Sequence, residues 1–575
     1  MQQPSFRRVA AFVLVLATMC TPLSSVGVAA DQPPTLPLVQ MLRDAQEATA
    51  KEHWVEAESL WSRVVSANPT GAGFWSALGD ARYRTRAYRT AIVAYRRAFE
   101  LGAPVPNVTA YNIAASCSLL GERDNALHWV ETSVALGFSD LGAMRSDRDF
   151  ASLRDDATFR TLTFADDPAT LSRDDGWRYD VRYLAHEIKR IATFPWVRTP
   201  ETTFDAAISD LQRRVPQLTD FQIGLEMRKI IALLGRSHTI LYNGKPGASA
   251  FQPLPFQTYF FDDGLFIIAA DAKHKDLVGA QILRLDGHTP EQILALAAPF
   301  ISQTNRYRLL RICPETLRDA NTLHEIGLSA RSDRVTLDLR SFAGEKRRVA
   351  VAADPSLASY GDVAPADWIS AQQLAPGQAP RYLRNRQLNT WVDYDAQSRT
   401  AYLSINLLFA KLPRAPTGPA VDELFREVDT FAADKLVIDL RWDNGGNTTM
   451  GQQMFEHVMA RPQLNRQGKL YVIIGRQTFS AGINTAVMFE RYSNATLVGE
   501  PTSDSPNFVG ETTIVTLPYS KSRAGISNRY WQTSMPTDSR VWLNPTLYAP
   551  PTFASFRQNR DAAMEAILAV MIAPS

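Results

Sequence analysis

The chain has 575 residues, of which 45% are hydrophobic and 21% are charged, a composition typical of soluble globular proteins and not of disordered chains. This length predicts three or four domains, each large enough to bury its own core. The formal net charge is only +2, and no basic stripe stands out, so nothing predicts a nucleic-acid partner. Three cysteines are too few to predict a disulfide-built scaffold.

Residues 1–30 have the pattern of a secretory signal peptide. Arg7 and Arg8 precede an apolar run from Val9 to Met19, and small residues follow up to Ala30. The apolar run is too short to span a bilayer, and no later segment is long and apolar enough to do so. We therefore expect an exported protein, periplasmic or extracellular, whose mature chain has no membrane span.

Residues 38–165 carry a helical repeat of roughly 34 residues. In the copy that starts at Gly71, the characteristic small and aromatic residues are Trp75, Leu78, Gly79, Ala91, Tyr95 and Ala98. The pattern resembles the tetratricopeptide repeat, in which small residues let paired helices approach closely. Such an array presents a concave surface to a protein partner or serves as a packing spacer, and the sequence leaves both interpretations open.

Residues 175–250 predict a separate helical subdomain. Thr219 and Gln222 have the spacing of a capping box, which begins a helix, and Gly235 is placed to end that helix. Ser237 and His238 come almost directly after this glycine. A lone histidine just past a helix is more often solvated than catalytic, so the pair needs support from elsewhere in the chain.

Residues 251–352 are rich in short β-type runs. A strand that reaches Asp286-Gly287 predicts a tight turn, and a helix is expected to begin near Pro290. This order is similar to that of a PDZ domain, which would bind a peptide as an added strand or act as a rigid spacer. Residues 353–387 are rich in Pro, Ala and Gly and predict a linker or an extended crossing segment.

Residues 388–575 alternate strand and helix patterns, which predicts a partly parallel, mixed sheet covered by helices. Within it, the run from Lys435 to Met450 predicts a strand, a turn at Asn444-Gly445-Gly446 and a helix. Two glycines in that turn would let the backbone approach a ligand closely. Asp439 and Arg441 at the strand end are interpreted as a structural ion pair. The whole chain is thus predicted to be a multidomain α plus α/β protein.

A second motif, Lys469 to Glu500, predicts strand, sharp turn, helix and strand. Ser480 occupies the turn. A serine there can expose its hydroxyl at the carboxyl end of a sheet, beside a helix N-terminus, or it can simply be the N-cap of that helix. The residues of this stretch alone favour the cap.

Taken together, LVIDLRWDNGG and GRQTFSAG…TLVGEPT resemble the catalytic core of the C-terminal-processing (tail-specific) serine peptidase family, which includes the tricorn core. The resemblance covers roughly residues 175–570 and does not include the repeats. It implies that Ser480 is a nucleophile and that the amide of Ala481 is one oxyanion donor. The other donor would be an amide of the glycine turn, Gly445 in preference to Gly446.

The chain departs from that family at the general base. Processing members typically carry a lysine about 25 residues after the nucleophile, but the corresponding residue is Ser505, which cannot take the serine proton. Tricorn-like members use a Ser-His pair that follows a helix, and Ser237-His238 matches that pattern. The resemblance therefore implies His238 as the base, because a neutral imidazole accepts a proton near neutral pH. A carboxylate would orient the imidazole; Asp538 lies about where those relatives carry their acid, and Glu511 is the alternative.

The leading hypothesis is a secreted or periplasmic serine peptidase that cleaves peptides or unfolded proteins through an acyl-enzyme, without metal or cofactor. One alternative is an inactive peptidase-fold scaffold that binds proteins through its repeats and PDZ-like domain, in keeping with the missing lysine. Another is a hydrolase of non-peptide esters, because acyl transfer to serine does not fix the leaving group.

Overall fold

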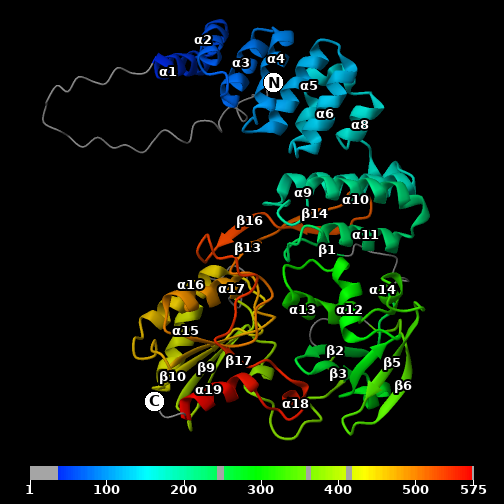
Figure 1. Cartoon of the computed structure of the whole chain (residues 1–575), viewed down its shortest axis with the longest axis vertical. Coiled ribbons are helices and arrows are strands. Elements are labelled where there is room, and N and C mark those ends of the chain that lie inside the picture. Colours follow the sequence, from blue (N-terminus) through cyan, green and yellow to red (C-terminus); the bar gives the residue numbers. More distant parts are fainter. Residues whose placement is uncertain (1–36, 243–250, 358–363, 410–416, 573–575) are drawn as a thin grey trace, which may run out of the picture. The chain divides into compact units, whose positions relative to one another are not determined.

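The computed structural model describes residues 37–242, 251–357, 364–409 and 417–572, so the predicted signal peptide lies outside the described residues. The chain divides into two compact units, residues 1–126 and 127–575. The fold is mixed α/β, with a helical N-terminal region and several sheets (Figure 1). No helix within these described ranges is long and apolar enough to cross a membrane.

The first unit consists of helices that pack on their neighbours in chain order (blue to cyan in Figure 1). They are α1 (Pro37–Ala50), α2 (Trp54–Ala67), α3 (Ala72–Arg84), α4 (Tyr88–Glu100) and α5 (Pro106–Leu119). Between α3 and α4, Gly79 faces Tyr95, and a Cβ at Gly79 would lie 2.5 Å from that ring. A glycine is therefore required for the two helices to approach. The assignment of these helices to a tetratricopeptide array stays a prediction.

The second unit begins within α6 (Arg123–Ala135) and continues with a helical region. Its helices are α7 (Leu141–Ser146), α8 (Ala157–Leu162), α9 (Arg173–Ile191), α10 (Glu201–Arg214) and α11 (Asp220–Ala232). The predicted capping box is present at α11, where Thr219 accepts the N–H of Gln222 and the Gln222 side chain accepts that of Thr219. This cap fixes where α11 begins; the helix ends at Ala232, ahead of the loop that carries His238.

A short strand ties the loop after α11 to the C-terminal part of the chain. β1 (Ile240–Tyr242) pairs antiparallel with β15 (Arg523–Ile526), which pairs in turn with β14 (Thr513–Thr516). The Thr239 and Ser527 hydroxyls are 2.7 Å apart. The residues of the His238 loop are thereby held against a segment that follows Ser480 in sequence.

The next region is an antiparallel sheet in the order β2-β3-β4-β5-β6, with β7 paired to β3. Its strands are β2 (Phe256–Phe261), β3 (Gly264–Ala270), β4 (Gln281–Leu285), β5 (Arg334–Arg340), β6 (Lys346–Ala352) and β7 (Ile369–Ser370). Helices α12 (Pro290–Ala297), α13 (Arg306–Thr316) and α14 (Ala320–Glu325) lie between β4 and β5 in sequence. Asp286 (φ 44°) and Gly287 (φ 85°) form the predicted tight turn, since such a turn needs positive φ at both positions. The identity of this region as a PDZ domain stays a prediction.

The described part of residues 353–387 packs against the rest of the second unit. β7 lies within it, and Trp368 and Tyr382 are buried. The choice between a linker and a crossing segment stays a prediction.

The C-terminal region contains a six-stranded sheet in the order β17-β12-β11-β10-β9-β8. Its strands are β8 (Thr390–Asp395), β9 (Thr400–Ile405), β10 (Lys435–Asp439), β11 (Leu470–Ile474), β12 (Thr496–Gly499) and β17 (Leu547–Tyr548). All neighbours are parallel except β8 and β9. Helices α15 (Thr417–Thr430), α16 (Thr448–Met459), α17 (Ala481–Tyr492) and α19 (Ala562–Ile572) accompany this sheet (Figure 1). The sheet is therefore mixed and helix-covered, as the alternating pattern predicts.

Because β10 and β11 are adjacent and parallel, the turns that follow them leave the same edge of the sheet. The turn after β10 carries the two glycines, and the turn after β11 carries Ser480. The sheet thus brings the two sequence motifs together.

Buried ion pairs connect the ends of these strands to other regions. Arg441 pairs with Asp439 and Asp561, each at 2.8 Å, with both carboxylates nearly inaccessible. Arg476, next to the end of β11, pairs with Glu500 at 2.6 Å and donates to the Phe260 carbonyl of β2. The predicted Asp439–Arg441 pair is present, and it extends to the start of α19.

We predict that Arg441→Ala lowers the free energy of unfolding by about 3–5 kcal/mol, because it leaves two buried carboxylates without their cation. The control is Arg399→Ala, which breaks a pair between side chains that are both about half exposed and should change stability little. Thermal and urea unfolding measure both variants. Equal, small effects would contradict a structural role for Arg441.

Candidate active site

Ser480 lies at the junction of β11 and α17 in a strained backbone conformation. Its φ is 51° and its ψ is −122°, a combination that non-glycine residues rarely adopt. It occupies the N-cap position of α17, yet its side chain makes no capping hydrogen bond. The structure therefore gives no support to the simple N-cap interpretation. A serine on a strained strand-to-helix turn is a common arrangement for a nucleophile.

The glycine turn after β10 lies directly against Ser480. A Cβ on Gly445 (φ +105°) would lie 2.6 Å from the Ser480 Cβ and 3.1 Å from the Ala481 nitrogen. The Phe479 N–H donates to the Asp443 carbonyl at 2.9 Å and fastens the two turns together. Only glycine at position 445 permits this approach.

The amides of the two turns differ in their availability. The Gly445 N–H donates to Asp443 Oδ1 at 2.9 Å, and Gly445 is buried. Gly446 is exposed, and neither its N–H nor that of Ala481 has an acceptor among the described residues. The role of Gly445 as an oxyanion donor stays a prediction, but in this structure its N–H is already engaged.

His238 packs against the residue that precedes the nucleophile. Its ring stacks on Phe479 at 4.2 Å between centroids and on Phe508 at 5.4 Å. The imidazole is buried, and neither ring nitrogen has a hydrogen-bond partner within the described part of the chain. Burial, and secondarily the charge of Arg308, lowers the pKa of His238 to about 3, so the ring is neutral at pH 7.

A carboxylate that we did not single out in the sequence lies beside His238. Asp504 Oδ2 is 3.9 Å from His238 Nδ1, too far for a hydrogen bond. Like the ring nitrogen, this oxygen is buried without a partner among the residues described. Asp504 Oδ1 accepts from Thr304 Oγ1 at 2.9 Å, and Thr304 contacts Ser237 Oγ at 3.0 Å. Burial raises the pKa of Asp504.

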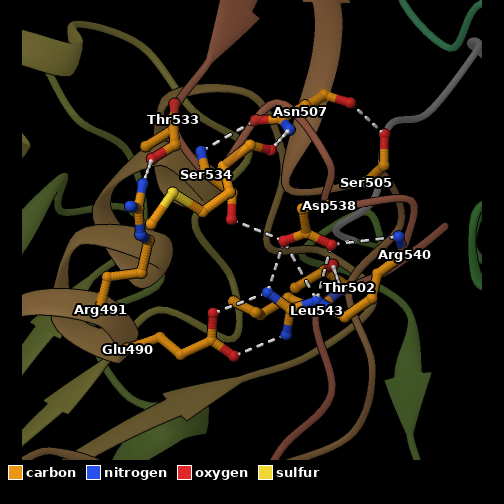
Figure 2. Close-up of polar contacts among 11 residues, drawn as sticks. Glu490, Arg491, Thr502, Ser505, Asn507, Thr533, Ser534, Asp538, Arg540 and Leu543 are labelled. Carbon is orange, nitrogen blue, oxygen red and sulfur yellow. Dashed lines mark hydrogen bonds and ion pairs between the residues drawn. The ribbon is translucent and has the colours of Figure 1, made fainter.

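Asp538 belongs to a different polar network (Figure 2). It accepts from Ser534 Oγ at 2.6 Å and pairs with Arg540 at 2.7 Å, and Arg540 also pairs with Glu490 at 2.7 Å. Arg540 holds the pKa of Asp538 well below its usual range. No contact joins Asp538 to His238 among the described residues, and the alternative, Glu511, is exposed. The orienting role of Asp538 therefore stays a prediction that these contacts do not support.

A cavity of about 300 Å³ lies at the same edge of the sheet. Gly475 and Gln477, between β11 and Ser480, contribute to its wall, as do Tyr259 of β2 and Trp442 after β10. Among the described residues, neither Ser480 nor His238 lines it. The cavity is thus a neighbour of the candidate reaction centre and not part of it.

No protein-family model matches the chain, and no curated protein matches its sequence significantly. Solved structures do resemble it. Mature CPAF complexed with lactacystin is 12% identical, with 69% of this chain and 98% of CPAF covered at a TM-score of 0.47. The photosystem II D1 C-terminal processing protease is 13% identical, with 70% and 98% covered at 0.33. The tricorn protease is 14% identical, with 69% and 36% covered at 0.31.

These neighbours are C-terminal-processing peptidases, the family that the two core motifs resemble. None of the three TM-scores reaches 0.5.

We predict that Gly445→Ala lowers the reactivity of Ser480 toward a fluorophosphonate by about a hundredfold or more, because the new Cβ must displace the serine. Gly468→Ala is the matched control, since Gly468 also has positive φ (+75°) but nothing lies within 4 Å of its Cβ position. The control should cost stability without changing labelling. Equal labelling of both variants would show that the Gly445 contact does not position Ser480.

Proposed function

We propose that this chain is an exported serine peptidase that cleaves peptides or unfolded proteins through an acyl-enzyme on Ser480. The observation that carries the proposal is the position of Ser480. Ser480 is on a strained turn, its side chain is not used as a helix cap, and it packs against a glycine turn in which Gly446 is exposed. A neutral, buried histidine stacks on the adjacent residue.

In the proposed reaction, Ser480 Oγ attacks the carbonyl carbon of the scissile bond while His238 accepts the hydroxyl proton. The amides of Gly446 and Ala481 stabilise the negative charge that develops on the carbonyl oxygen. The protonated imidazole then donates its proton to the departing amine. Water, activated by the same histidine, releases the acyl group and restores Ser480.

We further propose that Asp504 is the carboxylate that orients His238. An unpartnered imidazole nitrogen and an unpartnered carboxylate oxygen face each other across 3.9 Å in a buried site. Buried polar groups strongly favour a hydrogen bond, and an approach of about 1 Å would form one. Ser237 acts through Thr304, which holds the other oxygen of Asp504.

The second candidate function is that of an inactive scaffold. It is favoured by one observation: no hydrogen bond joins Ser480 to His238 among the described residues. Catalysis therefore requires the two side chains to close on each other, which is common when substrate is absent. In the scaffold case the helical repeats would bind a protein partner and Ser480 would stay unreactive.

Labelling with a fluorophosphonate distinguishes the two functions. We expect wild type to be labelled, Ser480→Ala not at all, and His238→Ala about a hundredfold more slowly or less. Since the pKa of His238 is lowered to about 3, its basic form persists in mild acid, and labelling should fall only below about pH 4. Unlabelled wild-type protein would favour the scaffold, and a fall centred near pH 6.5 would indicate a solvated imidazole.

Two matched substitutions test the orienting carboxylate. Asp504→Asn should slow labelling about a hundredfold or more, because an amide cannot stabilise the imidazolium as a carboxylate does. Asp538→Asn should change labelling less than about threefold, because Asp538 is engaged by Arg540, and should mainly lower thermal stability. The opposite ranking of labelling rates would assign the role to Asp538.

A further inference from the structure

A second buried carboxyl, that of Asp443, lies beneath the glycine turn and connects it to the nucleophile turn. Asp443 is fully buried. Its N–H donates to the Leu440 carbonyl at 2.9 Å, and its own carbonyl accepts the Phe479 N–H at 2.9 Å. Its side-chain Oδ1 accepts the Gly445 N–H at 2.9 Å. One residue thus makes contact with both turns that form the candidate site.

The other carboxyl oxygen, Oδ2, has no hydrogen-bond partner among the described residues. It faces the start of α17, where a Cβ on Gly482 would lie 2.8 Å from it. Glycine at position 482 therefore makes room for the carboxyl. A fully buried carboxylate with one unpartnered oxygen and no cation beside it is costly, and such a group usually retains its proton.

The charged side chains on the elements around Asp443 form ion pairs or hydrogen bonds with other residues. On its own loop, Arg441 pairs with Asp439 and Asp561. On the nucleophile turn, Arg476 pairs with Glu500.

On α17, Glu490 and Arg491 lie toward the far end of the helix and bind Arg540 and the Thr533 carbonyl. His238, which stacks on Phe479, is neutral. Burial raises the pKa of Asp443 well above its usual range, against a smaller opposing effect of the Gly445 and Leu408 N–H groups.

We infer that Asp443 is a proton-bearing positioning residue: by accepting the Gly445 N–H, it orients the glycine turn so that the Gly446 amide joins that of Ala481 at the oxyanion. This inference rests on the proposed function for its catalytic consequence. Asp443 touches neither substrate nor the reacting atoms. If it lost its proton, its negative charge would lie beside the amides that stabilise an oxyanion and would oppose the transition state.

The substitution Asp443→Asn tests the inference directly. Asparagine keeps an acceptor for Gly445 and replaces the neutral O–H with a neutral N–H. We expect Asp443→Asn to label with a fluorophosphonate at pH 7 within about threefold of wild type. We also expect wild-type labelling to decline at alkaline pH as Asp443 loses its proton, and Asp443→Asn to lack that decline. Asp443→Ala, which has no acceptor, should label at least about thirtyfold more slowly.

Two results would overturn the inference. A loss of about a hundredfold in Asp443→Asn would show that the ionised carboxylate is required. Labelling of a folded Asp443→Ala variant at the wild-type rate would show that the residue does not position the turn.

Thermal melting as a function of pH tests the protonation state without any peptidase assay. A carboxyl whose pKa is higher in the folded than in the unfolded chain stabilises the fold most below about pH 4, and this contribution is lost as pH rises through the folded pKa. The melting temperature of Asp443→Asn should therefore rise relative to wild type between about pH 5 and pH 9.

Asp434→Asn, at an exposed ion pair, is the control and should show no such trend. If the difference in melting temperature between Asp443→Asn and wild type stayed constant over this pH range, Asp443 would not carry a proton in the folded chain, and the inference would be overturned. If wild type is not labelled at all, the proposed function fails, while the melting curves still decide the state of Asp443.

Discussion

The structure around the candidate site depends on one close approach between two backbones. Gly445 lies against Ser480 so closely that no larger residue fits, and this contact is possible because β10 and β11 end at the same edge of a parallel sheet. The approach holds Ser480 in a conformation with positive φ. It also places the exposed amide of Gly446 on the turn that packs against the serine. The strained conformation of Ser480 and the position of Gly446 beside it are therefore two results of the same packing.

The buried polar and charged groups of the second unit differ in whether they have partners. Arg441 and Arg476 are each fully paired with carboxylates, which is the arrangement that makes a buried charge tolerable. His238, Asp504 and Asp443, in contrast, carry buried polar atoms without partners among the described residues. Native proteins leave few such atoms, so four of them on these three residues indicate a role other than stability.

Much of the local structure could be predicted from the sequence because it depends on residues close together in the chain. The capping box at Thr219, the turn at Asp286-Gly287 and the apolar strands each follow from a few neighbouring side chains. The two motifs that follow β10 and β11 could each be recognised as a strand end followed by a turn and a helix. The chemistry suggested for Ser480 rested on the family that these motifs resemble, and it stays a prediction. The sequence pattern did not reveal that Ser480 leaves its capping position unused.

The sequence by itself thus determined the elements, their order and the turn on which Ser480 lies. Only the tertiary structure decided which distant side chains meet. It placed Asp504 beside His238 and Asp538 beside Arg540, although the resemblance implied Asp538 as the acid. It also showed that Asp443 holds the Gly445 amide. The spacing of these residues along the chain does not predict such contacts. They form only where separate strands, loops and helices pack together and exclude water from the same small volume.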